Sequence, residues 1–230
     1  MTWRWLIFFS AAATFGATVS GQVELTNSRD PNVRRHNYAG VVLWLEPVDH
    51  AAPAVPPQHL RMIQKNKQFQ PHVLAIGVGG TVDFPNFDPI FHNAFSNFSA
   101  QQFDVGLYAP GTSKAVTFNK PGIVRVFCQI HSSMSAIIAV IATPWYTVTP
   151  ESGKFTIGNV PAGEYMLRIF HERALPDTLK FLEHRITVPP EGLTISLISI
   201  SETGYIAAPH LDKHGKPYAP ETGTYGGVGK

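Results

Sequence analysis

Short apolar-rich runs, some of which alternate with polar residues, recur through the middle of this chain and predict β-strands. Between residues 61 and 143 the strand-like runs are "HVLAIGV", "TVDF", "SKAVTF", "GIVRVFC" and "AIIAVIA". Glycine, proline and asparagine separate the runs, and such spacing predicts a sandwich or barrel of about seven or eight strands. Because the pair Gly79-Gly80 precedes a strand and not a helix, we interpret it as a hairpin turn and not as a dinucleotide-binding loop.

A second set of strand-like runs flanks this region on both sides. Before it stand "VEL" and "YAGVVLWLEPV", and after it, between residues 144 and 203, stand "GKFTI", "EYMLRIF", "HRITV" and "LTISLISI". The later segment alone is small for an independent sandwich. We expect the early strands to complete it, which would make the middle region an insertion between two halves of one outer sandwich.

These patterns divide the chain into five parts. The stretch "DHAAPAVPPQHL" is rich in proline and alanine and is typical of a linker. The residues from Tyr205 onward are rich in glycine and proline, which predicts flexibility. The predicted parts are a signal peptide (1–21), the first strands of the outer sandwich (22–50), an inserted domain (61–143), the remainder of the outer sandwich (144–203) and a flexible tail (204–230).

The composition favours an all-β fold. The chain has 230 residues, of which 44% are hydrophobic, enough for one large domain or two small ones with packed cores. Its 19 glycines and 19 prolines accompany many Val, Ile, Thr and Phe residues, which favour strands and turns. We therefore predict one larger β-sandwich and a second, small one.

The start of the chain predicts a secretory signal. Arg4 precedes an uncharged apolar segment that ends in the small residues Val19-Ser20-Gly21, which suits cleavage before Gln22. A retained membrane anchor is the alternative, but hydroxyl side chains dilute the segment, and a span prefers about 20 strongly apolar residues. We expect an exported protein, periplasmic or secreted, with no stable membrane span after cleavage.

The charge balance gives no indication of a nucleic-acid partner. Without Arg4 the chain carries 17 Lys and Arg against 16 Asp and Glu, so its net charge is close to zero. A nucleic-acid-binding domain normally shows a strong excess of basic residues.

The only cysteine, Cys128, lies in "FCQIHSSM", with His131 three residues and Met134 six residues further on. A single cysteine cannot form an internal disulfide, so the thiol is inert in a core, reactive, or a metal ligand. The run before Cys128 is strand-like, as is the run after Met134. All three side chains therefore belong to one connecting loop, and they can face one ion only if that loop curls back.

A second imidazole is available from "PNFDPIFHNAF", which places His92 on a predicted turn 36 residues before Cys128. Two histidines, one cysteine and one methionine are the donor set of blue-copper electron-transfer sites. Zinc is the alternative metal, although structural zinc sites usually employ more cysteines and rarely methionine. A third interpretation packs Cys128 and Met134 in the core with no metal.

These motifs resemble the cupredoxins. The pattern Cys-x-x-His-x-x-Met after a strand, with His-Asn upstream, is similar to their copper motif, and the loop length is like that of amicyanin. The longer stretch from "FPNFDPIFHNAFS" to "FCQIHSSMSA" is similar to bacterial cupredoxin-domain proteins described as methylamine-utilisation-like. The resemblance covers residues 61–143 and implies a Greek-key β-sandwich.

The resemblance also implies a role for each residue of the motif. It implies one type 1 copper per chain, with Cys128 as the thiolate, His92 and His131 as imidazole ligands and Met134 as the axial ligand. It implies that Asn93 ties the two ligand loops together by hydrogen bonds. We further expect apolar neighbours around the thiolate and few hydrogen bonds to its sulfur.

The outer region resembles another family. The stretch "GKFTIGNVPAGEYMLRIFHE" is similar to the carboxypeptidase-regulatory-like, transthyretin-like β-sandwiches, and "YAGVVLWLEP" is similar to their early strands. That family is mostly structural or adhesive, so the resemblance implies no catalysis here.

Other candidate residues show no spacing that indicates a site. A second copper site has no recognisable ligand spacing among the remaining histidines considered, which are His72, His171, His184, His210 and His214. Paired catalytic acids have no recognisable spacing among the aspartates Asp83, Asp88 and Asp104.

The favoured hypothesis is therefore an exported electron carrier, not an enzyme. It would exchange single electrons with unidentified redox proteins through weak encounters. The resemblance implies that His131 reaches the surface, with "IHSSM" and "YAPG" as the docking patch. A copper enzyme is disfavoured because the extra His-x-His clusters are absent. The alternative is a copper-binding or surface-binding β-sandwich module without an electron-carrier role, and the oligomeric state stays open.

Overall fold

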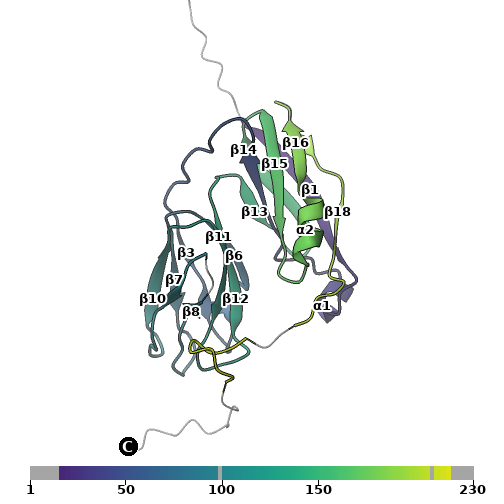
Figure 1. Ribbon diagram of the computed structural model, residues 1–230. Helices are drawn as coiled ribbons and strands as arrows, with labels where there is room; N and C mark the ends of the chain where they lie inside the picture. Colours follow the sequence, from purple (N-terminus) through teal and green to yellow (C-terminus); the bar gives the residue numbers. More distant parts are fainter. Residues whose placement is uncertain (1–15, 98–99, 208–209, 219–230) are drawn as a thin grey trace, which may run out of the picture.

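The computed structural model describes residues 16–97, 100–207 and 210–218, and its regular structure is almost entirely β (Figure 1). The predicted all-β class is confirmed. The described residues contain two short helices, α1 (Pro31–Arg34) and α2 (Pro176–Leu182), neither of which the strand patterns predicted. No helix in these ranges is long and apolar enough to cross a membrane.

One β-sandwich, here called the inner sandwich, lies between residues 59 and 141. Its larger sheet has the strand order β6-β12-β11-β8-β9, and its smaller sheet has the order β10-β7-β3. Its strands are β3 (His59–Arg61), β4 (Ile63–Gln64), β5 (Phe69–Gln70), β6 (Val73–Gly77), β7 (Gly80–Pro85), β8 (Phe95–Ser96), β9 (Phe103–Asp104), β10 (Ser113–Phe118), β11 (Gly122–Phe127) and β12 (Ser135–Ile141). Inward-facing residues of the two sheets, among them Phe84, Phe118 and Ile138, form one buried core.

A second sandwich, the outer sandwich, combines strands from both sides of the inner one in the sequence. Its sheets have the orders β14-β1-β17, with β18 also paired to β1, and β13-β2-β15-β16. Its strands are β1 (Ala17–Thr26), β2 (Val42–Pro47), β13 (Tyr146–Val148), β14 (Lys154–Val160), β15 (Gly163–Phe170), β16 (His184–Val188), β17 (Leu193–Thr194) and β18 (Ile198–Ser201). A separate core, with Tyr165 and Leu167 near its centre, fills the space between these sheets. The boundaries drawn for independently folding domains stay predictions.

The two sandwiches lie side by side and share a small apolar contact (Figure 1). Val42 of β2 packs with Ala139 and Ile141 of β12 in a third buried cluster. The predicted linker crosses this junction, where the Gln58 carboxamide oxygen accepts hydrogen bonds from the Gly77 N–H at 2.9 Å and the Tyr146 hydroxyl at 2.7 Å. The linker is therefore anchored to both sandwiches.

Two local expectations differ from the structure. The turn at Gly79-Gly80 joins β6 to β7, but these strands belong to different sheets, so it is not a hairpin. Strand β1 begins at Ala17, and Val19 is fully buried, so the predicted cleavage before Gln22 falls inside a strand of the outer sandwich. Residues 1–15 of the predicted signal lie outside the described residues, and cleavage stays a prediction.

The predicted tail also differs in part. Residues 210–218 are not free but lie against the inner sandwich, where Tyr218 and His210 contact the end of β11. Glycine and proline content predicts how flexible an isolated segment is. It carries no information on the aromatic contacts that this segment makes with the inner sandwich. The last residues of the predicted tail, 219–230, lie outside the described residues.

Candidate metal centre

The loop between β11 and β12 carries three of the four predicted ligands. These strands pair antiparallel up to Phe127 and Ser135, which stand opposite each other, so residues 128–134 must turn back on themselves. The Cys128 N–H donates to the Met134 carbonyl at 3.2 Å, and the Met134 N–H donates to the His131 carbonyl at 3.1 Å. The backbone therefore gathers Cys128, His131 and Met134 at one end of the sandwich.

His92 reaches the same end from the connection between β7 and β8. It forms an isolated antiparallel bridge with Tyr108, in which each N–H donates to the carbonyl of the other residue, at 3.2 and 2.9 Å. The bridge fixes the backbone of His92 in a stretch that has no regular strand of its own.

The side chains of His92, Cys128 and His131 converge. The Cys128 sulfur lies 3.9 Å from His92 Nδ1 and 3.7 Å from His131 Nδ1, and the donor atoms of the three residues all lie within 4.8 Å of one another. All three residues are 0% exposed. The two imidazole rings lie 4.8 Å apart at an interplanar angle of 63°.

These separations fit a single ion shared by the three donors. With the bond lengths of zinc sites, about 2.0 Å to nitrogen and about 2.3 Å to sulfur, three such ligands place sulfur about 3.7 Å from each nitrogen. The observed values of 3.9 and 3.7 Å lie close to that distance. The geometry thus fits a metal ion, and the donor chemistry decides which metal.

Met134 lies in the same buried core as Cys128 and is also 0% exposed. A buried thioether beside a thiolate and two imidazoles is a soft donor that copper accepts and that zinc sites rarely use. The assignment of Met134 as the axial ligand stays a prediction.

The surroundings of Cys128 disfavour its charged form in the absence of a cation. Burial raises the pKa of the thiol, although backbone N–H groups of Ile130, His131 and Asn93 hydrogen-bond to the sulfur and oppose that shift. These amides come from both ligand loops, and the expectation of few hydrogen bonds to the sulfur stays a prediction. A bound cation would stabilise the thiolate further, since a metal ion ordinarily deprotonates a coordinating thiol.

A carboxylate that the sequence analysis set aside holds His92. The His92 Nε2–H donates to Asp88 Oδ2 at 2.8 Å, and both side chains are buried. This bond leaves Nδ1 of the neutral ring unprotonated and directed toward Cys128, the state that a metal ligand requires. Burial lowers the pKa of His92 and outweighs the opposing effect of Asp88, which favours the same neutral ring.

Asp88 is itself fixed by a tight turn. The backbone N–H groups of Asn66 and Lys67 donate to its two oxygens at 2.6 and 2.8 Å. Burial opposes ionisation of Asp88, but hydrogen bonds from Lys67, His92 and Asn66 outweigh it and lower the pKa. The spacing Asp-x-x-x-His was the one sequence signal that could have identified this pair.

Asn93 joins the two ligand loops, the arrangement that the resemblance implies. Its side-chain oxygen accepts a hydrogen bond from the Gln129 N–H at 3.3 Å, while its amide group donates to Asp104 Oδ1 at 2.7 Å and to the Gly106 carbonyl at 3.0 Å. The side chain thus links the loop after Cys128 to the turn after β9.

The structure contradicts the expectation that His131 reaches the surface. The residue is 0% exposed because its ring faces inward against His92 and Cys128. Large exposed apolar side chains instead lie near His92 and Tyr108 in the sequence, namely Phe87 (55%), Phe91 (55%) and Leu107 (59%).

Within the described residues the three converging donors are the only such group. Two of the other histidines pair with carboxylates of the outer region: His72 with Glu172 at 2.9 Å and His171 with Glu202 at 2.8 Å. His210 stacks on Phe127 and belongs to no group of candidate metal ligands among the described residues.

No protein-family model and no curated protein matches the chain. Solved structures match parts of it. A purple cupredoxin from Nitrosopumilus maritimus is 22% identical, with 36% of this chain and 99% of that chain covered and a TM-score of 0.33. Amicyanin from Paracoccus versutus is 22% identical, with 38% and 85% covered and a TM-score of 0.35.

A Cu-containing nitrite reductase from Thermus scotoductus SA-01 is 27% identical, with 52% of this chain but only 28% of that chain covered and a TM-score of 0.35. Similarity of this extent does not establish a family for the chain. The interpretation of the centre therefore depends on its own residues and distances.

Proposed function

We propose that the protein is an exported carrier of single electrons with one type 1 copper bound by His92, Cys128, His131 and Met134. The observation that carries the proposal is the convergence of two unexposed imidazoles on one unexposed thiol, at 3.9 and 3.7 Å. Copper bound there supplies a one-electron redox couple. The residues of the chain bind the ion, hold the ligands in place and exclude water.

The donor set favours copper in both of its oxidation states. Thiolate and thioether ligands are soft and suit Cu(I), whereas imidazoles also suit Cu(II). Asp88 orients His92, and Asn93 links the two ligand loops, so the ligands are held before any metal arrives. Ligands fixed in this way need to move little when the charge of the ion changes.

Burial of the ligands favours electron transfer over copper storage. The sandwich core surrounds Cys128 and Met134, and His92 and His131 are equally inaccessible. Water is excluded from the sulfur, and a metal in this cage exchanges slowly. A storage or delivery protein would instead expose its ligands to an acceptor.

Partner proteins would approach near the His92 connection. Phe87, Phe91 and Leu107 each expose more than half of their side chains there. Exposed apolar side chains suit the weak encounters of redox proteins, which bury less than about 1,200 Å².

The alternative function is a copper-binding or surface-binding module without a role in electron transfer. The outer sandwich supports it, because that sandwich contributes no ligand to the centre and accounts for about half of the strands. Under this alternative the metal would stabilise the inner sandwich and would not cycle.

Voltammetry of the copper-loaded protein tests the proposal. We expect one reversible one-electron wave, with equal charge passed in both directions and no change in bound copper. A Cys128→Ser variant loaded with copper serves as the control and should lose this wave. Copper that binds tightly but cannot be cycled, or that is released on reduction, would contradict the electron-carrier role and favour the module.

A further inference from the structure

The segment of residues 210–218 crosses the inner sandwich beside the metal centre, and we call it the strap. Figure 1 shows the chain reaching this position from the outer sandwich, past the end of β18. The strap contacts Cys128 and the end of β11 on one side and β9 on the other, and neither the donor set nor the motif accounts for it.

The strap has a fixed conformation of its own. The carboxylate of Asp212 accepts hydrogen bonds from the N–H groups of His214 and Lys216, at 2.9 and 2.8 Å. The Asp212 N–H donates in turn to the Lys216 carbonyl at 2.8 Å, and Gly215 adopts a positive φ of 74° inside the turn. This compact turn sets the spacing between the side chains at the two ends of the strap.

The two ends of the strap, Tyr218 and His210, meet beside the cysteine ligand. The Tyr218 hydroxyl donates to the Cys128 carbonyl at 2.7 Å. The His210 ring stacks on Phe127, the residue before the ligand, with centroids 4.1 Å apart and an interplanar angle of 27°. Tyr218 and His210 also meet edge to face, so the two aromatic contacts support each other.

The hydrogen bonds between the two ends of the strap form a chain that points toward Cys128. His210 Nδ1 lies 3.2 Å from the Tyr218 oxygen and 3.4 Å from the Leu211 carbonyl, so Nδ1 carries the proton and donates. Among the described residues His210 Nε2 has no hydrogen-bond partner. A hydroxyl that accepts one bond while donating another is a stronger donor.

The middle of the strap contacts β9, which is hydrogen-bonded to the His92 loop. Lys213 Nζ lies 2.8 Å from Asp104 Oδ2, and Asp104 Oδ1 accepts the hydrogen bond from Asn93, the neighbour of His92. The strap therefore connects to the His92 side through Asp104 and Asn93, and to the Cys128 side through Tyr218.

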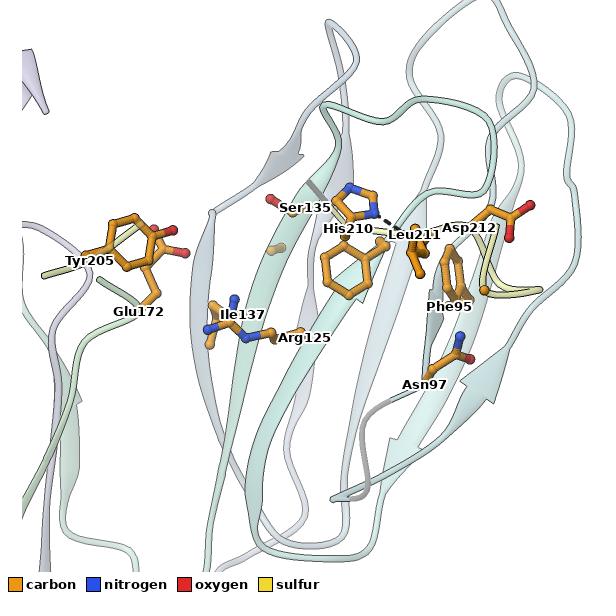
Figure 2. A pocket seen from close by; sticks show the side chains of 13 residues that line it. Phe95, Asn97, Arg125, Ser135, Ile137, Glu172, Tyr205, His210, Leu211 and Asp212 are labelled. Atoms are coloured by element: carbon orange, nitrogen blue, oxygen red, sulfur yellow. Dashed lines mark hydrogen bonds between the residues drawn. The ribbon is translucent and has the colours of Figure 1, made fainter. Parts of the chain in front are cut away.

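A pocket of about 450 Å³ lies beside these contacts and separates the strap from part of the sheet. Figure 2 shows His210, Leu211 and Asp212 on one side of it, with Phe95 close by and with Tyr205 and Glu172 at the far end. The strap is therefore held at a few defined points, each of which a single substitution can remove.

We infer that the strap is a positioning element for the copper centre, in which Tyr218 and Lys213 hold the two ligand loops at the spacing that the metal requires. This inference rests on the proposed function for its copper readouts. The chain thereby uses a segment distant from the motif to set the rate of metal release and the reduction potential.

The direction of each effect follows from the contacts. Loss of one hydrogen bond of about 1 kcal/mol lets the Cys128 loop open about five times as often. The hydroxyl proton of Tyr218 also places partial positive charge beside the ligand, which favours the more negative, reduced centre. Its removal should therefore lower the reduction potential.

The test compares Tyr218→Phe with Tyr165→Phe in the full-length protein. Both substitutions remove a tyrosine hydroxyl that donates to a backbone carbonyl, but Tyr165 donates to Pro161, at 2.9 Å, in the outer sandwich. We expect Tyr218→Phe to release Cu(I) to a chelator about five times faster and to shift the potential downward. Tyr165→Phe should change neither.

A third variant, Lys213→Gln, removes the ion pair with Asp104 and should act in the same direction but more weakly, because the pair is partly exposed. If both Tyr218→Phe and Lys213→Gln release Cu(I) at the wild-type rate and keep the wild-type reduction potential, the strap does not position the centre.

A readout without metal separates this inference from the proposed function. In the copper-free protein, Tyr218→Phe should speed amide hydrogen exchange at residues 128–134 about fivefold, and Tyr165→Phe should not. If the wild-type protein binds no copper while this exchange difference appears, the proposed function fails and the strap still positions the loop. If exchange at these amides is unchanged, the strap does not position the loop.

Discussion

Each of the two sandwiches buries a histidine against a carboxylate, and the two pairs have the same length. His92 Nε2 lies 2.8 Å from Asp88 in the inner sandwich, and His171 Nε2 lies 2.8 Å from Glu202 beside the outer one. All four side chains are nearly inaccessible. What distinguishes the pairs is the second nitrogen of each ring.

His92 Nδ1 faces the Cys128 sulfur, whereas His171 Nδ1 has no partner among the described residues. The carboxylates differ too, since Glu202 also binds Arg173 and Ser28, while the backbone of Asn66 and Lys67 holds Asp88. A buried histidine and carboxylate are thus a structural pair by themselves. They become part of a metal centre when another loop delivers sulfur to the free nitrogen.

Replacement of each histidine by alanine should separate the two roles most strongly. His92→Ala should lower copper affinity by more than the roughly 100-fold that loss of an outer partner can cause, because it removes a ligand. His171→Ala should leave copper affinity unchanged and destabilise the protein by about 2 kcal/mol, because Glu202 loses a buried partner. Chelator competition measures the copper affinity, and urea unfolding measures the free energy of unfolding. A fall in copper affinity in His171→Ala would contradict the purely structural role of the outer pair.

Copper itself should stabilise one sandwich and not the other. At a free copper concentration 1,000 times the dissociation constant, binding to the folded state adds about 4 kcal/mol. Hydrogen exchange should therefore slow in β7, β11 and β12 of the inner sandwich. Equal slowing in β14 and β15 would show that the sandwiches unfold as one unit.

Acid should weaken the outer pair in a defined range. Burial opposes ionisation of Glu202, but His171, Ser28 and Arg173 outweigh it and lower the pKa from 4.5 to about 2. Because the folded pKa lies below the unfolded one, this stabilisation is complete above pH 4.5 and disappears as the pH falls toward 2.

The loss should amount to about 3 kcal/mol in the free energy of unfolding. Urea unfolding from pH 6 to pH 2.5 measures it, and Glu202→Gln should show a flatter dependence. An identical slope in the variant and the wild type would assign acid sensitivity to other groups.

Asp88→Asn should have the smallest of these effects. We expect copper affinity to fall about 10-fold to 100-fold, because His92 is less firmly oriented. The reduction potential should rise, since a negative charge next to the ligand favours the oxidised centre. Asp83→Asn is the matched control, because Asp83 pairs with the exposed His59, at 3.0 Å, in the same sandwich. If Asp88→Asn and Asp83→Asn have the same reduction potential, the Asp88 carboxylate does not act on the centre through His92.

The sequence predicted the converging donors because their chemistry is visible in single residues. Cysteine, histidine and methionine are uncommon, and strand patterns on both sides of Cys128 placed them on one loop. Alternation likewise predicted several long strands, including β11, β14 and β15, since each has one buried face. A continuous apolar run predicted β12, which is buried on both faces.

The remaining features depend on contacts that no local pattern encodes. Asp88 holds His92 only because Asn66 and Lys67 turn with positive φ angles of 57° and 54° and present their amides. Tyr218 meets Cys128 across 90 residues. The pairing of β6 and β7 with different sheets is also a matter of tertiary packing, so a turn motif could not reveal it.

The central claim is that His92, Cys128 and His131 bind one copper ion through the thiolate. Titration of the metal-free protein with Cu(II) tests it directly when visible absorption is followed. We expect an intense copper-thiolate band that saturates at one copper per chain and is absent from Cys128→Ser. Copper binding without that band, or a band that persists in the variant, would contradict it.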